Sequence, residues 1–375
     1  MVIGISHANE AGTRYPAERK SFVDPATGME ILAITTHPAS DIKIYQTHPQ
    51  WSHDGNFIVF RSNRTGKDQY FAYEETTGEL IQLTDSQVGK ICLSRKDGML
   101  YYLQVDGHRD QAKALVKLDM KRLLEASKRG QVGNPENYEH IVTTFPDHTA
   151  NAGGFSLDAH EKVAYLGIRH SDTKWSLDKV DLANGERKTL IELPWRIGHI
   201  QANPWKSGEI VYCHETGGDA PQRMWIINGD GSGNKPLYEE APTEWATHEV
   251  WVNKDTVMFN LGGGAEATDP RRRKPHGITT IDVRTNEVHL YDQLPGGTYW
   301  HCAALPDLNF AIGDSKQGDL YLLDLINGGR TLLTAKHLPN GGPAHPHQNI
   351  SSDGKRVLFG SDWFGNPDIM LLELP

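Results

Sequence analysis

HPQWSHDGNFIVFRSNRTGKDQYFAYEETTGELIQLTD, residues 48–85, is the stretch that decides the fold of this 375-residue chain. It contains an alternating apolar segment, an Asp-Gly turn, a β-rich run, a glycine turn and two further strand-like runs. The C-terminal stretch HPHQNISSDGKRVLFGSDWFGNPDIMLLELP, residues 345–375, has the same signals in the same order. A recurrence of this kind indicates one supersecondary unit that is used several times.

Weaker copies of the unit lie between these two stretches. They begin near Val88, Asn151, His199, His248 and His301. The chain then holds seven units of roughly 40 to 50 residues, which is the size of a four-stranded propeller blade. The sequence therefore predicts an all-β fold, a seven-bladed β-propeller. Length alone would suggest two or three domains, but the repeat predicts one domain over residues 1–375.

The two ends of the chain predict how the ring closes. The last unit has three strands and then ends, while KSFVDPATGMEILAITT, residues 20–36, is typical of a strand pair without a unit of its own. We expect the strand near residues 29–35 to be the outer strand of the last blade, since closure of this kind leaves no exposed sheet edge. One segment departs from the β pattern: residues 118–130, LDMKRLLEASKRG, predict a short helix inserted in the second blade.

Composition limits the classes of partner. The chain carries 38 basic and 48 acidic residues, and its basic run RRRK at 271–274 is short, so we expect no nucleic-acid partner. Cys92, Cys213 and Cys302 lie in different units without C-x-x-C spacing, which argues against a disulfide framework or a cysteine zinc site. No apolar run of membrane-spanning length and no signal peptide is evident, so we expect a cytoplasmic protein without a membrane contact. A signal peptide removed beforehand would leave the same sequence.

Histidines recur at one phase of the repeat, just before a core-facing strand, and would converge in a ring of blades. They are His48, His199, His248, His301, His345 and His347. Metal binding and proton transfer are the leading uses of converging imidazoles.

The His-Pro-His segment is the strongest metal signal. His345 and His347 would point to one side of a strand, and His301 opens the adjacent blade at the equivalent position. Three imidazoles with coordination positions left open are typical of a catalytic metal site, whereas surface or capped histidines are the alternative. Imidazole suits zinc, iron, manganese, nickel and copper alike.

Two further residues have competing interpretations. His248 lies one blade further round, where it would reach whatever binds the metal, or would be a strand-start histidine bonded to a neighbouring loop. Arg223 is either an exposed surface arginine or a clamp for a carboxylate.

Several short motifs, in order from residue 12 to the end, together resemble the oligogalacturonate lyases. They are GTRYPAERKSFVD at 12–24, YQ at 45–46, GH at 198–199, CHE at 213–215, QRMW at 222–225, THEVW at 247–251, HPH at 345–347 and SDWFGNP at 361–367. The resemblance implies a seven-bladed propeller with a divalent metal, most simply manganese, at the mouth of the central channel. It also implies β-elimination of short uronate oligosaccharides.

The resemblance assigns roles to individual residues. It implies metal ligation by His301, His345 and His347, a general-base role for His248 and charge stabilisation by Arg223. The family's pattern has a glutamine ligand where this chain has Gly342. Water, a residue such as Gln348, or a diverged metal site and substrate preference would account for that change.

The expected function is a metal-dependent lyase that forms a 4,5-unsaturated product from an acidic oligosaccharide. The candidate substrate contacts are His199, Tyr45, Gln46, Trp300 and Trp363, although aromatic residues in propeller blades are more often core. Two alternatives stay open. One is a lyase or hydrolase for a different uronide-containing glycan. The other is a non-catalytic propeller, similar to periplasmic TolB-like scaffolds, that binds a protein partner.

Overall fold

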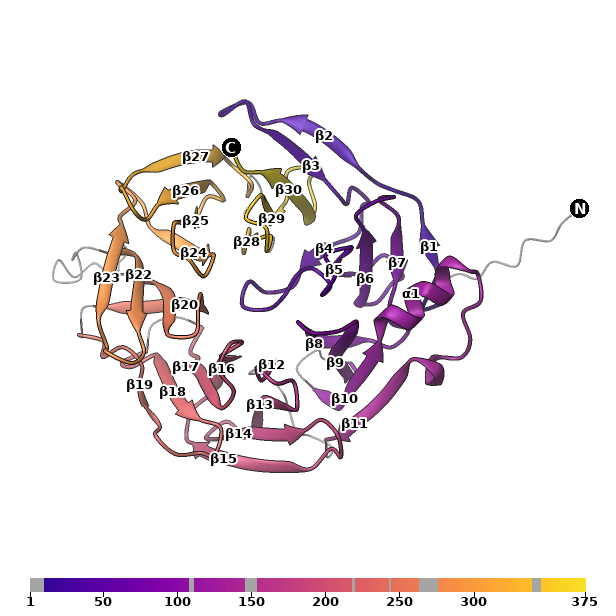
Figure 1. The fold of residues 1–375 in the computed structure, drawn as a ribbon, viewed down its shortest axis with the longest axis horizontal. Coiled ribbons are helices and arrows are strands. Elements are labelled where there is room, and N and C mark those ends of the chain that lie inside the picture. The colour runs from indigo at the N-terminus through magenta and orange to yellow at the C-terminus, as the bar shows by residue number, and fades with distance from the viewer. Residues whose placement is uncertain are drawn as a thin grey trace, which may run out of the picture.

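Seven antiparallel sheets stand around a central axis in the computed structural model of this chain (Figure 1). The structure describes residues 10–107, 111–145, 154–217, 220–242, 244–262, 276–338 and 345–375. The predicted all-β, seven-bladed propeller is confirmed. The basic run at 271–274 and Gly342 lie outside the described residues.

Each blade runs outward from a first strand beside the axis. The first three blades consist of β4 (Asp41–Lys43), β5 (Phe57–Ser62), β6 (Gln69–Glu74) and β7 (Leu80–Gln82); β8 (Val88–Leu93), β9 (Met99–Val105), β10 (Ala112–Asp119) and β11 (Glu139–Thr144); and β12 (Phe155–Leu157), β13 (Val163–Ser171), β14 (Lys174–Asp181) and β15 (Arg187–Leu193).

The next three blades repeat this order. They consist of β16 (Ile197–Ala202), β17 (Glu209–His214), β18 (Met224–Asn228) and β19 (Lys235–Pro236); β20 (Trp245–Trp251), β21 (Thr256–Gly262), β22 (Gly277–Asp282) and β23 (Val288–Asp292); and β24 (Tyr299–Ala304), β25 (Phe310–Ser315), β26 (Leu320–Asp324) and β27 (Arg330–Thr334).

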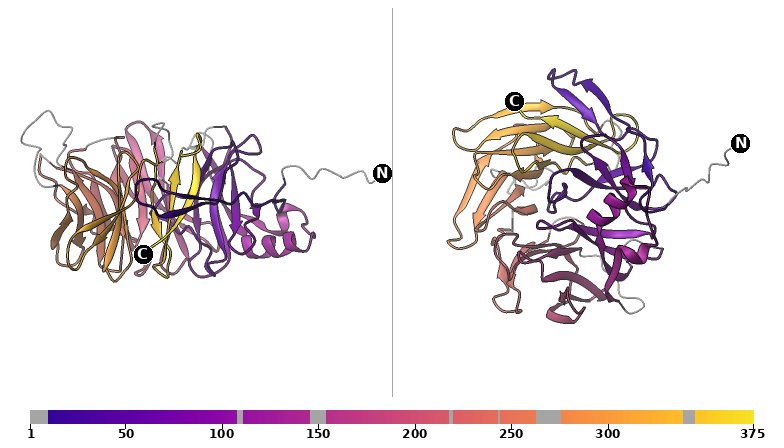
Figure 2. Two further views of the ribbon diagram at one scale, coloured as in Figure 1. Left: turned by 90° about the horizontal axis from the view of Figure 1, so that it is seen from above. Right: turned by 45° about the vertical axis from the view of Figure 1, so that its right-hand side comes forward.

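The N-terminal segment closes the ring, as the sequence predicts. The seventh blade contains β28 (Asn349–Ile350), β29 (Arg356–Ser361), β30 (Asp368–Glu373), β3 (Glu30–Ala33) and β2 (Lys20–Val23) in that order. β3 pairs antiparallel with β30, so it is the fourth strand, and β2 adds a fifth strand outside it. A second N-terminal strand, β1 (Arg14–Tyr15), pairs with β7 and so extends the first blade. The side view in Figure 2 shows this segment crossing the rim of a disc-shaped molecule.

A helix and a turn of 3-10 helix interrupt the second blade between β10 and β11. The helix α1 spans Met120–Lys128 and the 3-10 turn spans Pro135–Asn137. The carboxylate of Asp119 caps α1 by accepting a hydrogen bond from the backbone N–H of Arg122, which satisfies one of the donors left unpaired at a helix start. In the part of the chain that the structure describes, no helix combines the length and hydropathy that crossing a membrane requires.

The core lies between the blades. Val59 and Ala72 of the first blade pack against Leu100, Tyr102 and Val116 of the second, and all five side chains are buried. Alternation along each strand puts one set of apolar residues on each sheet face, so every blade is held by both neighbours. Burial of a large apolar side chain contributes roughly 1.5–3 kcal/mol.

Candidate functional site

Bulges in the first strands of four blades shape the axial end of the propeller. The pairing register shifts between Val88 and Ile91 in β8, and at the equivalent positions of β16, β20 and β24. A bulge bends its strand and re-aims a side chain, and it interrupts the hydrogen-bond ladder there. The bulged positions are occupied by Gly89 and Lys90, His199 and Ile200, His248 and Glu249, and Trp300 and His301.

Three of the site histidines have a left-handed backbone. The φ angles are 48° at His199, 56° at His248 and 42° at His347. A residue other than glycine costs on the order of 1–3 kcal/mol in such a conformation, and such residues cluster at functional sites. The strain is held here by the surrounding blades, and it turns the imidazoles toward one another.

The predicted metal ligands come together. The ring centroid of His301 lies 4.2 Å from that of His347 and 5.9 Å from that of His345, and the last two are 5.7 Å apart. His248 adjoins this group, with its ring centroid 4.4 Å from that of His301. The structure therefore places the four side chains from three blades in one cluster, which we call the histidine cluster: His248, His301, His345 and His347.

The reason for the approach of His345 and His347 differs from the one predicted. We expected both residues on a strand, where every second side chain shares a face. The strand β28 begins only at Asn349, and the left-handed conformation of His347 makes the turn that brings the rings together. The segment thus converges as a shaped loop rather than as a strand.

The hydrogen bonds of this cluster leave metal-binding nitrogens free. The ring Nδ1 of His301 is 2.8 Å from the Oδ2 of Asp314, and both side chains are buried. The Nδ1 of His347 is 3.1 Å from the carbonyl oxygen of His345. A carbonyl oxygen can only accept, so His347 carries its hydrogen on Nδ1 and keeps the lone pair on Nε2, and an ionised Asp314 gives His301 the same tautomer. The residues present therefore fit a divalent metal held through Nε2 atoms.

The lowered pKa values of the cluster histidines also favour metal binding. Burial, followed by the charge of neighbouring histidines and Lys43, lowers the pKa of His301 well below its ordinary value, and the same causes act on His347. Burial also lowers the pKa of His248, with smaller contributions from His301, His199 and Arg223 among its neighbours. Neutral imidazoles are the form that binds a metal or accepts a proton.

The segment between β4 and Trp51 enters the channel (Figure 1). Its residue Gln46 donates weak hydrogen bonds to the carbonyl oxygens of His248 and Cys302 in the fifth and sixth blades. The carbonyl of Gln46 in turn accepts a hydrogen bond from Asn349. Gln46 is therefore a buried brace between blades, and this arrangement does not support our expectation of a substrate contact.

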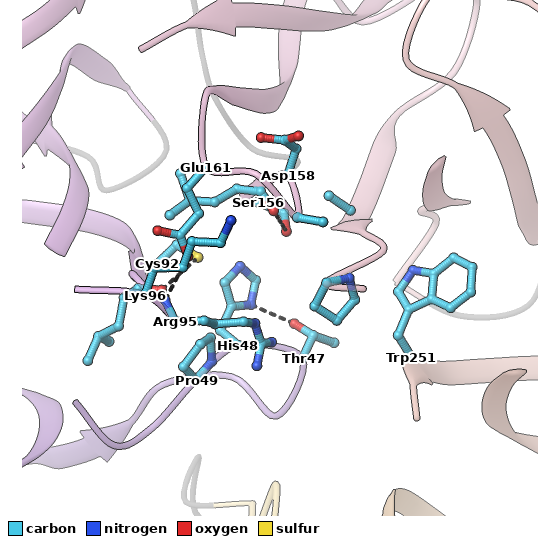
Figure 3. Close-up of a pocket in the computed structure, with 15 residues that line it drawn as sticks. Thr47, His48, Pro49, Cys92, Arg95, Lys96, Ser156, Asp158, Glu161 and Trp251 are labelled. Atoms are coloured by element: carbon cyan, nitrogen blue, oxygen red, sulfur yellow. Dashed lines mark hydrogen bonds between the residues drawn. The ribbon is translucent and has the colours of Figure 1, made fainter. Parts of the chain in front are cut away.

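Tyr45 and His48 of the same segment have different surroundings. The ring of Tyr45 lies between the rings of His199 and His347, at 5.3 and 4.9 Å, so it borders the cluster. His48 lies in a small pocket, where its Nδ1 bonds to the hydroxyl of Thr47 (Figure 3). Its Nε2 bonds to the carbonyl oxygen of Phe155. Burial lowers the pKa of His48 to about 4, and these bonds make it a structural residue.

Side-chain amides replace the ladder bonds that the bulges remove. Gln201 donates to the carbonyl of Glu249, Asn260 to that of Trp300, and Gln348 to those of His301 and Ile312. Buried carbonyls need such partners, so each amide holds a site residue of the neighbouring blade in position. Gln348 is fully buried in this role, and its Oε1 has no hydrogen-bond partner among the described residues, so the structure leaves open a role for Gln348 at the metal site.

Arg223 is not the exposed arginine that its sequence position suggested. Its side chain is 4% exposed, and its guanidinium lies 3.2 Å from the Oε2 of Glu215. Burial would raise the pKa of Glu215, but Arg223 and His199 outweigh it and lower that pKa to about 2. The contact of Arg223 with the site residues therefore runs through its ion pair with Glu215.

The two tryptophans predicted as substrate contacts lie in different parts of the molecule. The ring of Trp300 lies 4.6 Å from that of His248, so it borders the histidine cluster. Trp363 is partly buried; it stacks on Phe22 of β2 at 5.4 Å, lies beside His337 and packs against the core of the seventh blade. Our expectation of a sugar contact at Trp363 stays a prediction.

A cavity of about 400 Å³ opens beside the cluster. His199, Tyr45 and His347 line it on the cluster side, and Arg61, Lys90 and Arg196 add positive charge. An overall charge of -10 would repel an acidic ligand, so the local cations matter for its approach.

A second set of donor atoms lies next to the cavity. Atoms of His199, Cys213 and Glu215 are within 4.8 Å of one another, which is close enough for one metal ion. Glu215 already pairs with Arg223, and burial raises the pKa of Cys213 well above its ordinary value. A guanidinium and a neutral thiol disfavour a cation there, so the histidine cluster is the better metal site.

Several site residues were missed from the sequence. Glu215 and Glu249 stand inside the quoted motifs CHE and THEVW, yet a glutamate beside a histidine has no distinctive spacing. Asp314 and Lys43 come from parts of their blades that no motif marks. Lys43 donates to the carbonyl of His347 at 2.5 Å and so holds the left-handed turn.

Comparison with known proteins gives consistent matches. The family model described as oligogalacturonate lyase matches residues 10–262. An oligogalacturonate lyase of Dickeya dadantii is 25% identical over 95% of this chain and 96% of its own length. An oligogalacturonide lyase of Pectobacterium atrosepticum is 24% identical over 97% of this chain and 98% of its own.

Solved structures share the fold. An oligogalacturonate lyase in complex with manganese superposes with a TM-score of 0.82 and 23% identity, covering 98% of both chains. An oligogalacturonate lyase from Vibrio parahaemolyticus has a TM-score of 0.80 and 19% identity, covering 98% of this chain and 99% of its own. These matches confirm the resemblance that the sequence motifs indicated.

Proposed function

Because this chain belongs to the oligogalacturonate lyase family, a family of carbon–oxygen lyases, we propose that it cleaves short oligogalacturonides by metal-dependent β-elimination. The observation that carries the proposal is the pair of fixed tautomers at His301 and His347, which leaves Nε2 lone pairs beside His345 and His248. The product would carry a double bond between C4 and C5 of the sugar at the new end.

The metal would be held by His301, His345 and His347. Manganese is favoured because a protein of the same fold is described in complex with it. When bound, a divalent metal supplies Lewis acidity, which stabilises the negative charge that develops on the uronate carboxylate. The position of the family's glutamine ligand is Gly342. The Nε2 of Gln348 donates to carbonyl oxygens of the sixth blade, while its Oε1 has no partner among the described residues.

His248 is the proposed general base. Burial and its positive neighbours keep it neutral at ordinary pH, and its ring adjoins that of His301. A neutral imidazole can accept the C5 proton, which the adjacent carboxylate makes acidic. Arg223 adds positive charge on the same side, and Tyr45 and Trp300 offer aromatic surface to the sugar.

The test is a panel of uronides with and without chelator. We expect trigalacturonate to give the ultraviolet absorbance of an unsaturated uronate, chelation to remove the activity, and added manganese to restore it. Turnover of another uronide in the panel, without turnover of trigalacturonate, would support the alternative of a different substrate. A protein that binds no metal and turns over no uronide would overturn the proposal and favour a non-catalytic propeller.

A further inference from the structure

The carboxylate of Glu249 is buried away from water beside the candidate site. It follows His248 on β20, it is 0% exposed, and neither of its oxygens has a hydrogen-bond partner among the described residues. Within the part of the chain that the structure describes, its one ion-pair contact is with His199, whose Nδ1 lies 3.3 Å from Oε1. A carboxylate removed from water is costly unless a polar or positive group faces it, and the imidazole of His199 is the group that faces Glu249.

A second carboxylate faces the other ring nitrogen of His199. The Nε2 lies 3.4 Å from the Oε2 of Glu215. The chain makes room for this contact at Gly198, where a Cβ atom would come within 2.7 Å of the Cβ of Glu215. His199 thus stands between two carboxylates, with Arg223 behind one of them.

The members of the histidine cluster have no such surroundings. Among the described residues, a carboxylate oxygen comes within ion-pair distance of only one cluster ring, that of His301, through Asp314. His199 therefore differs from its neighbours in the charge placed around it. The other titratable groups that face it are Tyr45, His248 and the thiol of Cys213.

His199 also reaches the space where a substrate would lie. Its side chain is 19% exposed and lines the cavity beside the cluster, whereas its Nδ1 is buried against Glu249. Its ring is stacked with that of His248, with centroids 6.2 Å apart and planes at 27°. Its Nε2 faces Glu215, and the side chain of Glu215 lines the same cavity.

We propose that His199 is the general acid of the elimination, the group that gives a proton to the glycosidic oxygen leaving from C4. The inference rests on the proposed function. The C5–H bond breaks and its proton goes to His248, while the electron pair forms the C4–C5 double bond. The C4–O4 bond breaks with its electrons on O4, which takes the proton from His199. Proton transfer from His248 to His199 after release restores both groups.

The test compares two leaving groups. A sugar leaving group needs a proton, whereas 4-nitrophenoxide is stable as an anion. For His199→Gln we expect kcat on trigalacturonate to fall by roughly 10²–10⁴-fold, and kcat on a galacturonate carrying 4-nitrophenoxide at C4 to fall less than about tenfold. Bound metal, measured by elemental analysis, should stay at the wild-type level. An equal loss on both substrates, or no loss on trigalacturonate, would overturn the proposal.

Further variants sharpen the assignment. Glu249→Gln removes the charge opposite Nδ1 with little change of shape, so kcat on trigalacturonate should fall more than kcat on the 4-nitrophenoxide substrate. The matched control is His289→Gln, at an exposed histidine on β23, and it should leave kcat on both substrates unchanged. If Tyr45→Phe alone shows the leaving-group selectivity, Tyr45 is the acid and His199 is not. A wild-type protein inactive on both substrates would instead contradict the proposed function.

Discussion

The ring Nδ1 of His301 lies 2.8 Å from the Oδ2 of Asp314, while the backbone N–H of the same histidine donates to Oδ1. One carboxylate thus fixes both the ring and the backbone of a proposed metal ligand. Acidic partners of this kind orient a ligating imidazole and make it more basic.

Asp314→Asn should therefore weaken metal binding by roughly 10–100-fold, because the variant keeps the shape but removes the charge. Competition with a chelator of known affinity measures this change. Asp307→Asn, in an exposed turn, is the matched control. Unchanged metal affinity in Asp314→Asn would mean that His301 is not a ligand.

His248→Ala should abolish turnover and retain the metal. Loss of a general base costs roughly 10²–10⁴ in rate, whereas the three proposed ligands stay in place. Single-substrate kinetics and elemental analysis of the same sample make the measurement. If the metal is lost with the activity, His248 belongs to the coordination sphere.

The acid limb of kcat/KM should lie well below pH 6.5. A base works only when unprotonated, and burial with positive neighbours lowers the pKa of His248 well below that value, so the active form persists as pH falls. A pH profile at saturating metal checks this, with the bound metal measured at each pH because protons compete for imidazole. A limb at or above pH 6.5 would contradict the role.

Gly198→Ala should cost activity through Glu215. The added Cβ would lie 2.7 Å from the Cβ of Glu215 and 3.1 Å from the Sγ of Cys213, so the carboxylate must move away from His199. We expect a loss of about 1–3 kcal/mol in the free energy of unfolding as well. Gly297→Ala, which meets only the flexible end of Leu294, is the control. Wild-type kcat in Gly198→Ala would show that this contact is dispensable.

Asp368→Asn should stabilise the protein near neutral pH. Burial, followed by the charge of Asp41, raises the pKa of Asp368 to about 8. A raised carboxyl pKa means that the native state binds the proton more tightly, so stability is full below pH 3.8 and falls as pH rises toward 8. The amide removes this penalty, which we put at about 2 kcal/mol.

Urea unfolding at several pH values measures the difference in stability between the wild-type protein and Asp368→Asn. The two proteins should have equal stability at low pH and diverge above pH 3.8. Asp353→Asn is the control of opposite sign, since hydrogen bonds in its turn lower the pKa of Asp353 and its carboxylate stabilises the fold above that pH. If Asp368→Asn loses stability at neutral pH, its hydrogen bond with Thr35 outweighs the charge.

The ring and its closure could be predicted because they depend on local signals. Turn residues and alternating apolar runs recur at a fixed period, and residues 20–36 are a strand pair without a blade. The pairing of β1 with β7 escaped prediction because a sheet edge accepts another strand wherever the chain reaches it. The stacking of Trp363 on Phe22 of β2 could not be predicted either, because the two residues lie far apart in the sequence.

The sequence by itself determined the repeat, the family resemblance and the set of histidines, because residue type and phase are properties of the chain. Tertiary structure alone decided how they are used. Left-handed turns at His199, His248 and His347 cancel the alternation of a regular strand, so no spacing rule predicts their directions. Asp314 beside His301 and Glu249 beside His199 place a carboxylate against each ring, and those contacts exist only once the strands are bent and the blades closed.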